Sequence, residues 1–92
     1  MPSKRIFIKI YGDVIGVNFR YYTRKFAQEL GIFGYVKNCA DQTVEIEAEG
    51  DEEKLKQLLD WAHQVSEWAR VDKVEHKWQG NRGEFEEFYV RY

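Results

Sequence analysis

The 92 residues suffice for one small domain with its own hydrophobic core, and they are too few for two. A formal net charge of −2 at pH 7 argues against nonspecific nucleic-acid binding and against a polybasic membrane anchor, which both need clustered basic residues. One cysteine, Cys39, excludes an internal disulfide. No apolar run approaches the roughly 20 residues of a membrane-spanning helix. We therefore expect a single cytoplasmic domain over residues 1–92.

Two hydrophobic periods predict the first strand and the first helix. Between residues 4 and 11 three isoleucines lie two positions apart, which predicts a half-buried strand. After a connection with two glycines, the apolar spacing changes to three and four from Phe19 to Leu30, which predicts an amphipathic helix. Gly31 follows and is suited to end the helix in a left-handed conformation.

An antiparallel hairpin is predicted next. Residues 33–39 and 43–49 read as strands, and the short turn at 40–42 joins them. In the second of these strands three apolar residues alternate with three glutamates, so we expect the glutamates to point away from the core. The turn type stays open, because Gln42 is a poor residue for a positive φ angle.

The second half of the chain predicts another helix and two further strands. Asp51 is a suitable N-cap for a helix, and acidic residues follow it. The apolar stripe of this helix has five members: Leu55, Leu58, Leu59, Ala62 and Val65. A connector at 66–69 leads to a strand at 70–78 and, after a turn, to a final strand at 85–92.

The order β-α-β-β-α-β, with a short extra strand at the end, predicts the split βαβ or ferredoxin-like arrangement. In this α+β fold an antiparallel sheet carries both helices on one face. No internal repeat or linker suggests a second domain.

The connection between the first strand and the first helix is the strongest candidate for a binding site. Gly12 and Gly16 permit backbone angles that turn successive amides inward, and the segment feeds a helix N-terminus, which attracts anions. Arg20 stands at that helix start, and its planar fork suits two phosphate oxygens. An ordinary strand-to-helix turn with a solvated arginine explains the spacing equally well. The segment does not match the Walker pattern, which argues against a nucleotide site.

Three sequence blocks resemble the acylphosphatase family. The run Gly12–Arg20 is similar to its signature G-x-V-Q-G-V-x-F-R, and Gly34–Asn38 is similar to its block G-[WY]-V-x-N. Asp41–Glu45 resembles its D-G-T-V-E. The resemblance covers nearly the whole chain. It implies hydrolysis of acyl phosphates to a carboxylate and inorganic phosphate, without a metal. We expect no other cofactor, and we expect a monomer, because most simple domains of this kind need no partner.

The resemblance also implies roles for individual residues. Arg20 corresponds to the arginine that binds phosphate, and Asn38 to the asparagine that positions the attacking water. The phosphate cradle corresponds to five successive main-chain amides: Ile15, Gly16, Val17, Asn18 and Phe19. The chemistry agrees with these roles. The leaving group is a carboxylate, whose conjugate acid has a pKa of about 4 to 5, so it can leave unprotonated and the site needs no general acid.

Two residues depart from the family pattern. Ile15 stands where the family usually has glutamine. If the side chain of that glutamine contacts substrate, the contact is lost here; if only its main-chain N–H serves, isoleucine suffices where its backbone angles are allowed for a β-branched residue. Gln42 stands where the family usually has glycine, which affects a turn more than the chemistry.

Other functions compete with this interpretation. A domain of this kind could capture phosphate or carbamoyl phosphate without turnover. A ferredoxin-like RNA-binding domain is disfavoured, because the outward glutamates of the third strand would repel a phosphate backbone. His63, His76 and Cys39 show no ligand spacing for a metal, and we expect ordinary structural roles for them.

Overall fold

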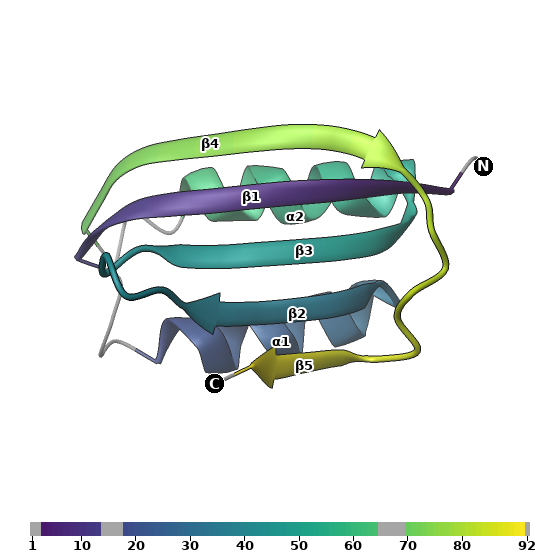
Figure 1. Cartoon of the computed structure of the whole chain (residues 1–92), viewed down its shortest axis with the longest axis horizontal. Helices are drawn as coiled ribbons and strands as arrows, with labels where there is room; N and C mark the ends of the chain where they lie inside the picture. Colours follow the sequence, from purple (N-terminus) through teal and green to yellow (C-terminus); the bar gives the residue numbers. More distant parts are fainter. Residues whose placement is uncertain (1–2, 14–17, 65–69, 92) are drawn as a thin grey trace.

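The computed structural model describes residues 3–13, 18–64 and 70–91 (Figure 1). Val65 and the predicted connector at 66–69 lie outside the described residues. Along the described parts of the chain the elements are β1 (Ser3–Asp13), α1 (Phe19–Leu30), β2 (Phe33–Asn38), β3 (Val44–Asp51), α2 (Glu52–Gln64), β4 (Arg70–Gly80) and β5 (Phe88–Arg91). Neither of the two helices in these parts is long and apolar enough to cross a membrane.

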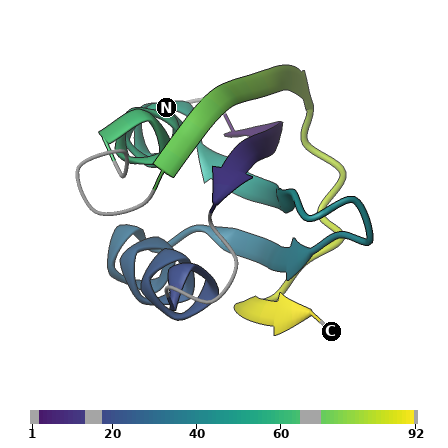
Figure 2. The same cartoon turned by 90° about the vertical axis from the view of Figure 1, so that its left-hand side faces the viewer.

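The sheet confirms the predicted ferredoxin-like α+β fold. Its strand order is β4-β1-β3-β2-β5, and β1 pairs antiparallel with both β3 and β4. Both helices cover the same face of the sheet (Figures 1 and 2). The opposite face carries no helix, and the β4–β5 connection passes on that side; we call it the open face. The prediction of a wholly antiparallel sheet needs one correction, because β5 pairs parallel with β2 and makes the sheet mixed.

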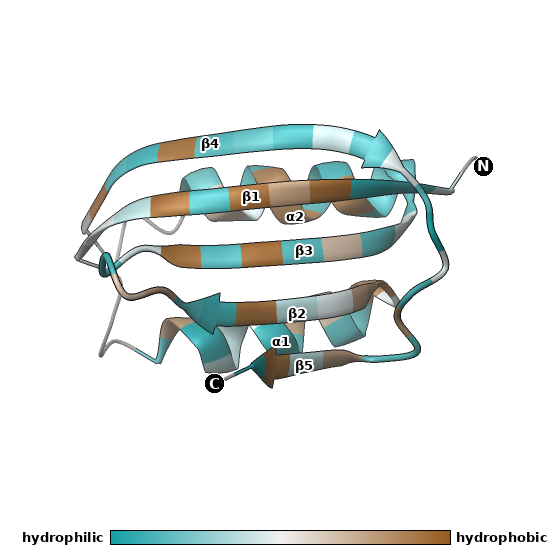
Figure 3. Ribbon diagram, viewed as in Figure 1, coloured by the Kyte–Doolittle hydropathy of each residue, from teal (hydrophilic) through white to brown (hydrophobic). Residues whose placement is uncertain are grey.

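The core lies between the sheet and the helices, where the predicted apolar residues meet. Hydrophobic and hydrophilic residues alternate along β1 and β3 in Figure 3, as a sheet with one buried face requires. The isoleucines of β1 and the leucines of α2 that face each other are fully buried: Ile6, Ile8, Ile10, Leu55 and Leu58. Burial of each such side chain contributes roughly 1.5–3 kcal/mol, so this layer holds both helices on the sheet.

Both predicted helix ends are confirmed. Gly31 has φ 73° and donates its N–H to the carbonyl of Gln28 at 3.1 Å, which ends α1. At the start of α2, the Asp51 carboxylate accepts the N–H of Glu53 at 3.1 Å, which is the bond of an N-cap. These local signals therefore set the helix bounds.

Glu49 lies on the predicted outward face but is not solvated. Only 4% of the residue is exposed, because the connection between β4 and β5 crosses over it. Its Oε2 accepts the N–H of Arg82 at 2.6 Å and of Gly83 at 3.1 Å, and its Oε1 accepts the N–H of Glu84 at 3.0 Å. Burial by itself would raise the pKa of Glu49, but these donors and the Arg5 guanidinium, 3.6 Å away, lower it below its ordinary value.

The last strand is shorter than predicted. It begins at Phe88, three residues after the predicted start at Phe85, because the preceding residues cross the open face of the sheet instead of joining it. The side chain of Phe85 packs there, with its ring 4.9 Å from the guanidinium carbon of Arg5 and 5.9 Å from the ring of Tyr35.

Candidate active site

The ends of several elements meet at one end of the sheet. β1 finishes there at Asp13, β2 finishes at Asn38, and β3 begins at Val44, which is paired with Asn38. Ile10 of β1 is the partner of Val44 on the other side. Figure 1 shows that α1 also begins at this end, behind the sheet in this view. Residues far apart in the sequence are thus gathered around the predicted connection.

Gly12 makes the bend that begins this connection. The register between β1 and β4 shifts after Tyr11, and Gly12 has φ 139°, which is a conformation that L side chains rarely adopt. The expectation that Gly12 takes a backbone angle that other residues avoid is therefore confirmed. The three following cradle positions, Ile15, Gly16 and Val17, lie outside the described residues.

The residue before α1 has a left-handed backbone conformation. Asn18 is left-handed, with φ 59° and ψ 26°, and Phe19 begins the right-handed helix. A left-handed residue followed by a right-handed one turns successive N–H groups toward a common concave side. Asn18 makes no side-chain capping bond, and the first turn of α1 holds no acidic residue. The positive end of the helix dipole is therefore not offset by a carboxylate of this turn.

Phe19 anchors the first turn of α1 in the core. It is 2% exposed, and its ring centroid lies 5.4 Å from that of Trp61 on α2. The hydroxyl of Thr23 donates to the carbonyl of Phe19 at 2.8 Å. These contacts hold the turn that carries Arg20, which is itself partly buried.

Asn38 lies on the side of the sheet that the helices cover. It follows the fully buried Val36 by two positions, so strand alternation places both on the helix-covered face. Asn38 is partly buried. Arg20 and Asn38 therefore share the same end of the sheet and the same side of it.

The turn after Asn38 has a left-handed residue at its end. Cys39 donates its N–H to Thr43 at 2.8 Å, and Gln42 donates its N–H to Cys39 at 3.0 Å. Gln42 has φ 66°. This is the pattern of a three-residue hairpin loop that closes with a left-handed residue, a place that glycine usually fills. The open question of the turn type is thus settled.

Sequence reasoning missed a polar cluster at this turn. The Asp41 carboxylate accepts from the hydroxyl of Thr43 at 2.5 Å and from its N–H at 3.2 Å, and it pairs with the ammonium of Lys9 at 3.2 Å. The Thr43 hydroxyl, followed by Lys9, lowers the pKa of Asp41 to about 2. The Asp-x-Thr spacing, typical of an Asx turn, could have indicated the bond from Thr43 to Asp41. Nothing in the sequence indicated that Lys9 on β1 would be the second partner.

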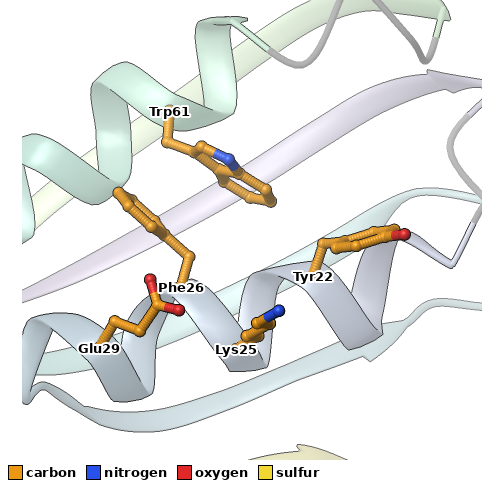
Figure 4. Close-up of a pocket in the computed structure, with 5 residues that line it drawn as sticks. All are labelled: Tyr22, Lys25, Phe26, Glu29 and Trp61. Atoms are coloured by element: carbon orange, nitrogen blue, oxygen red, sulfur yellow. The ribbon is translucent and has the colours of Figure 1, made fainter.

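A groove of about 600 Å³ lies apart from this site, between α1 and α2 (Figure 4). Its lining residues are Tyr22, Lys25, Phe26, Glu29 and Trp61. Phe26 and Trp61 stack with ring centroids 5.6 Å apart. At about 100° per residue around a helix, Tyr22 points roughly 160° away from Arg20. The groove therefore opens on another side of α1.

Potential metal ligands do not gather in the described ranges. No three His, Cys, Asp or Glu side chains there are grouped so as to hold a metal ion. His63 lies on α2 and His76 on β4, while Cys39 directly follows Asn38.

Comparison with known proteins gives consistent matches. The sequence profile of the acylphosphatase family matches residues 6–90. An acylphosphatase of Caldanaerobacter subterraneus subsp. tengcongensis is 41% identical over 88 residues, which are 96% of this chain and 98% of that protein. An acylphosphatase of Thermococcus kodakarensis is 45% identical over 83 residues, or 90% and 91% of the two chains. The crystal structure of acylphosphatase from Bacillus subtilis superposes with a TM-score of 0.90 at 29% identity, covering 97% of this chain and 99% of that chain.

Proposed function

This chain belongs to the acylphosphatase family, and on that premise we propose that Arg20 and the main-chain amides before it bind the phosphoryl group while Asn38 orients water. The chain is an acylphosphatase, which hydrolyses the carboxyl–phosphate bond of small acyl phosphates to a carboxylate and inorganic phosphate. One observation supports the residue roles above all others: α1 begins and β2 ends at the same end of the sheet, on its helix-covered side.

Phosphoryl binding follows from the charge at the start of α1. The amides of residues 15–19 and the helix dipole present positive partial charge, and Arg20 adds a full charge with a planar fork. An arginine in the first turn opposes the dipole at a cost of about 0.3–1 kcal/mol. A phosphoryl group bound between Arg20 and the amides reverses that cost, because both then face an anion.

Hydrolysis needs little more than positioning. The water oxygen attacks phosphorus in line while the bond from phosphorus to the acyl oxygen breaks, and the electron pair of that bond leaves with the carboxylate. The amide oxygen of Asn38 accepts a hydrogen bond from the water and aims it. A phosphoryl oxygen of the substrate takes the proton that water releases. Since the leaving carboxylate needs no proton and Arg20 neutralises phosphoryl charge, we propose that the reaction requires no metal or other cofactor.

The wider assignments remain our proposals. We propose that residues 1–92 form one acylphosphatase domain that acts as a cytoplasmic monomer and does not bind nucleic acid or membranes. The near-balanced charge of −2 supports this, because neither nucleic acid nor an anionic lipid surface is attracted to such a chain. The profile match over residues 6–90 supports a single domain.

The phosphate-binding role is tested with Arg20→Ala in an assay of benzoyl phosphate hydrolysis. We expect kcat/KM to fall by at least about a hundredfold, because an aligned charged donor is lost from the transition state. Titration with inorganic phosphate should show a matching loss of affinity. Arg24→Ala is the control, since Arg24 lies one turn further along α1 and should leave both quantities within about twofold.

The water-orienting role is tested with Asn38→Ala in the same assay. We expect kcat to fall by about a hundredfold or more, because the water loses its partner, while inorganic phosphate still binds with nearly unchanged affinity. Near-normal kcat in a folded Asn38→Ala protein would remove Asn38 from the mechanism. Normal phosphate binding without measurable turnover in the unmodified protein would instead indicate a binding module.

A further inference from the structure

Asp41 connects the turn between β2 and β3 to β1. One oxygen of its carboxylate accepts both donors of Thr43 and so closes the turn between β2 and β3. The other oxygen lies 3.2 Å from the ammonium of Lys9 on β1. This ion pair therefore links the turn at the end of β2 to β1, which is paired with β3 but not with β2.

Lys9 pairs with Asp41 and not with the glutamate that lies opposite it in the sheet. The register places Lys9 directly opposite Glu45, which would be the simplest partner. Glu45 instead accepts the hydroxyl of Tyr35 at 2.8 Å and pairs with Lys37 at 3.7 Å. Since Glu45 is already engaged from the β2 side, Lys9 reaches toward the turn.

The two ends of this link lead to the two halves of the active site. Asn38 is only three residues before Asp41 and ends the strand that the turn continues. On β1, the ammonium of Lys9 lies 5.5 Å from the ring centroid of Tyr11, which directly precedes the bend at Gly12. The link therefore fixes the end of β2 relative to the strand that feeds the phosphate-binding connection.

We propose that Lys9 and Asp41 are positioning residues of the acylphosphatase reaction, which hold the turn after Asn38 in register with the end of β1. The proposal rests on the proposed role of Asn38. Lys9 lies on the open face and Asp41 in the turn, whereas Asn38 lies on the helix-covered face, so the pair acts through the backbone and not by touching substrate. A small displacement of Asn38 costs turnover, because in-line attack tolerates little error in the position of the water.

The energetics allow positioning to be separated from folding. The side chain of Lys9 is 27% exposed and that of Asp41 is 55% exposed. Ion pairs this accessible add little to the free energy of unfolding, and the pKa of Asp41 is lowered more by the Thr43 hydroxyl, which remains when Lys9 is replaced. Loss of the pair should therefore leave the protein folded and lower its kcat.

The test compares Lys9→Met, Lys9→Arg and Asp41→Asn by kcat, KM, phosphate affinity and urea midpoint. We expect Lys9→Met and Asp41→Asn to lower kcat by roughly five- to tenfold, with KM and phosphate affinity within about twofold. Lys9→Arg keeps a cation for Asp41 and should restore kcat to within about twofold. Lys77→Met is the matched control, because Lys77 lies on the same open face, opposite Phe7, and should leave kcat unchanged.

Each contrary result has a distinct meaning. Wild-type kcat in folded Lys9→Met and Asp41→Asn proteins overturns the positioning role while leaving the proposed function intact. A loss that Lys9→Arg does not restore also overturns it, because the ion pair would then not be the cause. Wild-type kcat in Asn38→Ala would remove Asn38 from the mechanism, and this inference would fall with it.

Discussion

Gln42 occupies a backbone conformation that its side chain does not favour. Its φ of 66° closes the turn after Asp41, and its side chain is exposed. An L residue in the left-handed region costs about 1–2 kcal/mol relative to its preferred conformation. Glycine avoids this cost, although its unfolded chain has more conformational entropy to lose. The balance makes Gln42 a suboptimal residue at this place.

Gln42→Gly should therefore raise the free energy of unfolding by about 0.5–1 kcal/mol, measured as a higher urea midpoint at unchanged slope. Gln42→Ala is the control, because alanine keeps a Cβ atom and should bring no gain. Equal stabilisation by both variants would show that the backbone conformation is not the cause.

At the scale of elements, a buried carboxylate determines where the last strand lies. Glu49 accepts three main-chain N–H groups of the β4–β5 connection and faces Arg5. That connection packs Phe85 against Arg5 on the open face, and β5 then reaches the edge of β2. A connection held in this way returns the chain across the sheet, which explains why β5 is parallel to β2.

Glu49→Gln should lower the free energy of unfolding by about 2–4 kcal/mol. The amide of glutamine carries no charge for Arg5 and offers one oxygen where three N–H donors converge. Urea denaturation measures the loss, and Glu53→Gln on the exposed side of α2 is the control, with an expected change below about 0.5 kcal/mol. If the two substitutions had the same small effect, Glu49 would not hold the connection.

For the whole molecule, ionisation limits stability at both ends of the pH scale. The pKa of Asp41 is lowered from 3.8 to about 2, chiefly by the Thr43 hydroxyl and Lys9, and that of Glu49 is also lowered. A carboxyl group whose pKa is lower in the folded state stabilises it above the pKa of the unfolded chain. At high pH the reverse holds for Tyr35, since burial and the bond to Glu45 raise the pKa of its hydroxyl.

The free energy of unfolding should therefore be nearly constant from about pH 5 to about pH 9. This range lies between the pKa values of the unfolded chain, which are about 4 for carboxyl groups and about 10 for tyrosine. Below about pH 4 it should decline as Asp41 and Glu49 take up protons, and above about pH 10 as unfolding releases the proton of Tyr35. Urea denaturation across this range measures both limbs. Asp41→Asn should show a shallower acid limb, and an identical limb would contradict the role assigned to Asp41.

The sequence by itself determined the element order, the buried faces and the helix ends. These features depend on neighbours a few positions apart: the isoleucine alternation of β1, the cap at Asp51 and the left-handed Gly31. The resemblance to acylphosphatases likewise depended on contiguous blocks, and it singled out Arg20 and Asn38, whose roles remain predictions.

Only the tertiary structure decided the burial of Glu49, the parallel edge strand and the link from Lys9 to Asp41. Each joins residues that are distant in sequence, as Arg5 and Glu84 are when they meet at 3.0 Å. Hydrophobic period and turn chemistry act over a few residues, so they determine which face a side chain takes. Which segment later covers that face depends on strand register and on the path of the connections, and these are set only when the whole sheet forms.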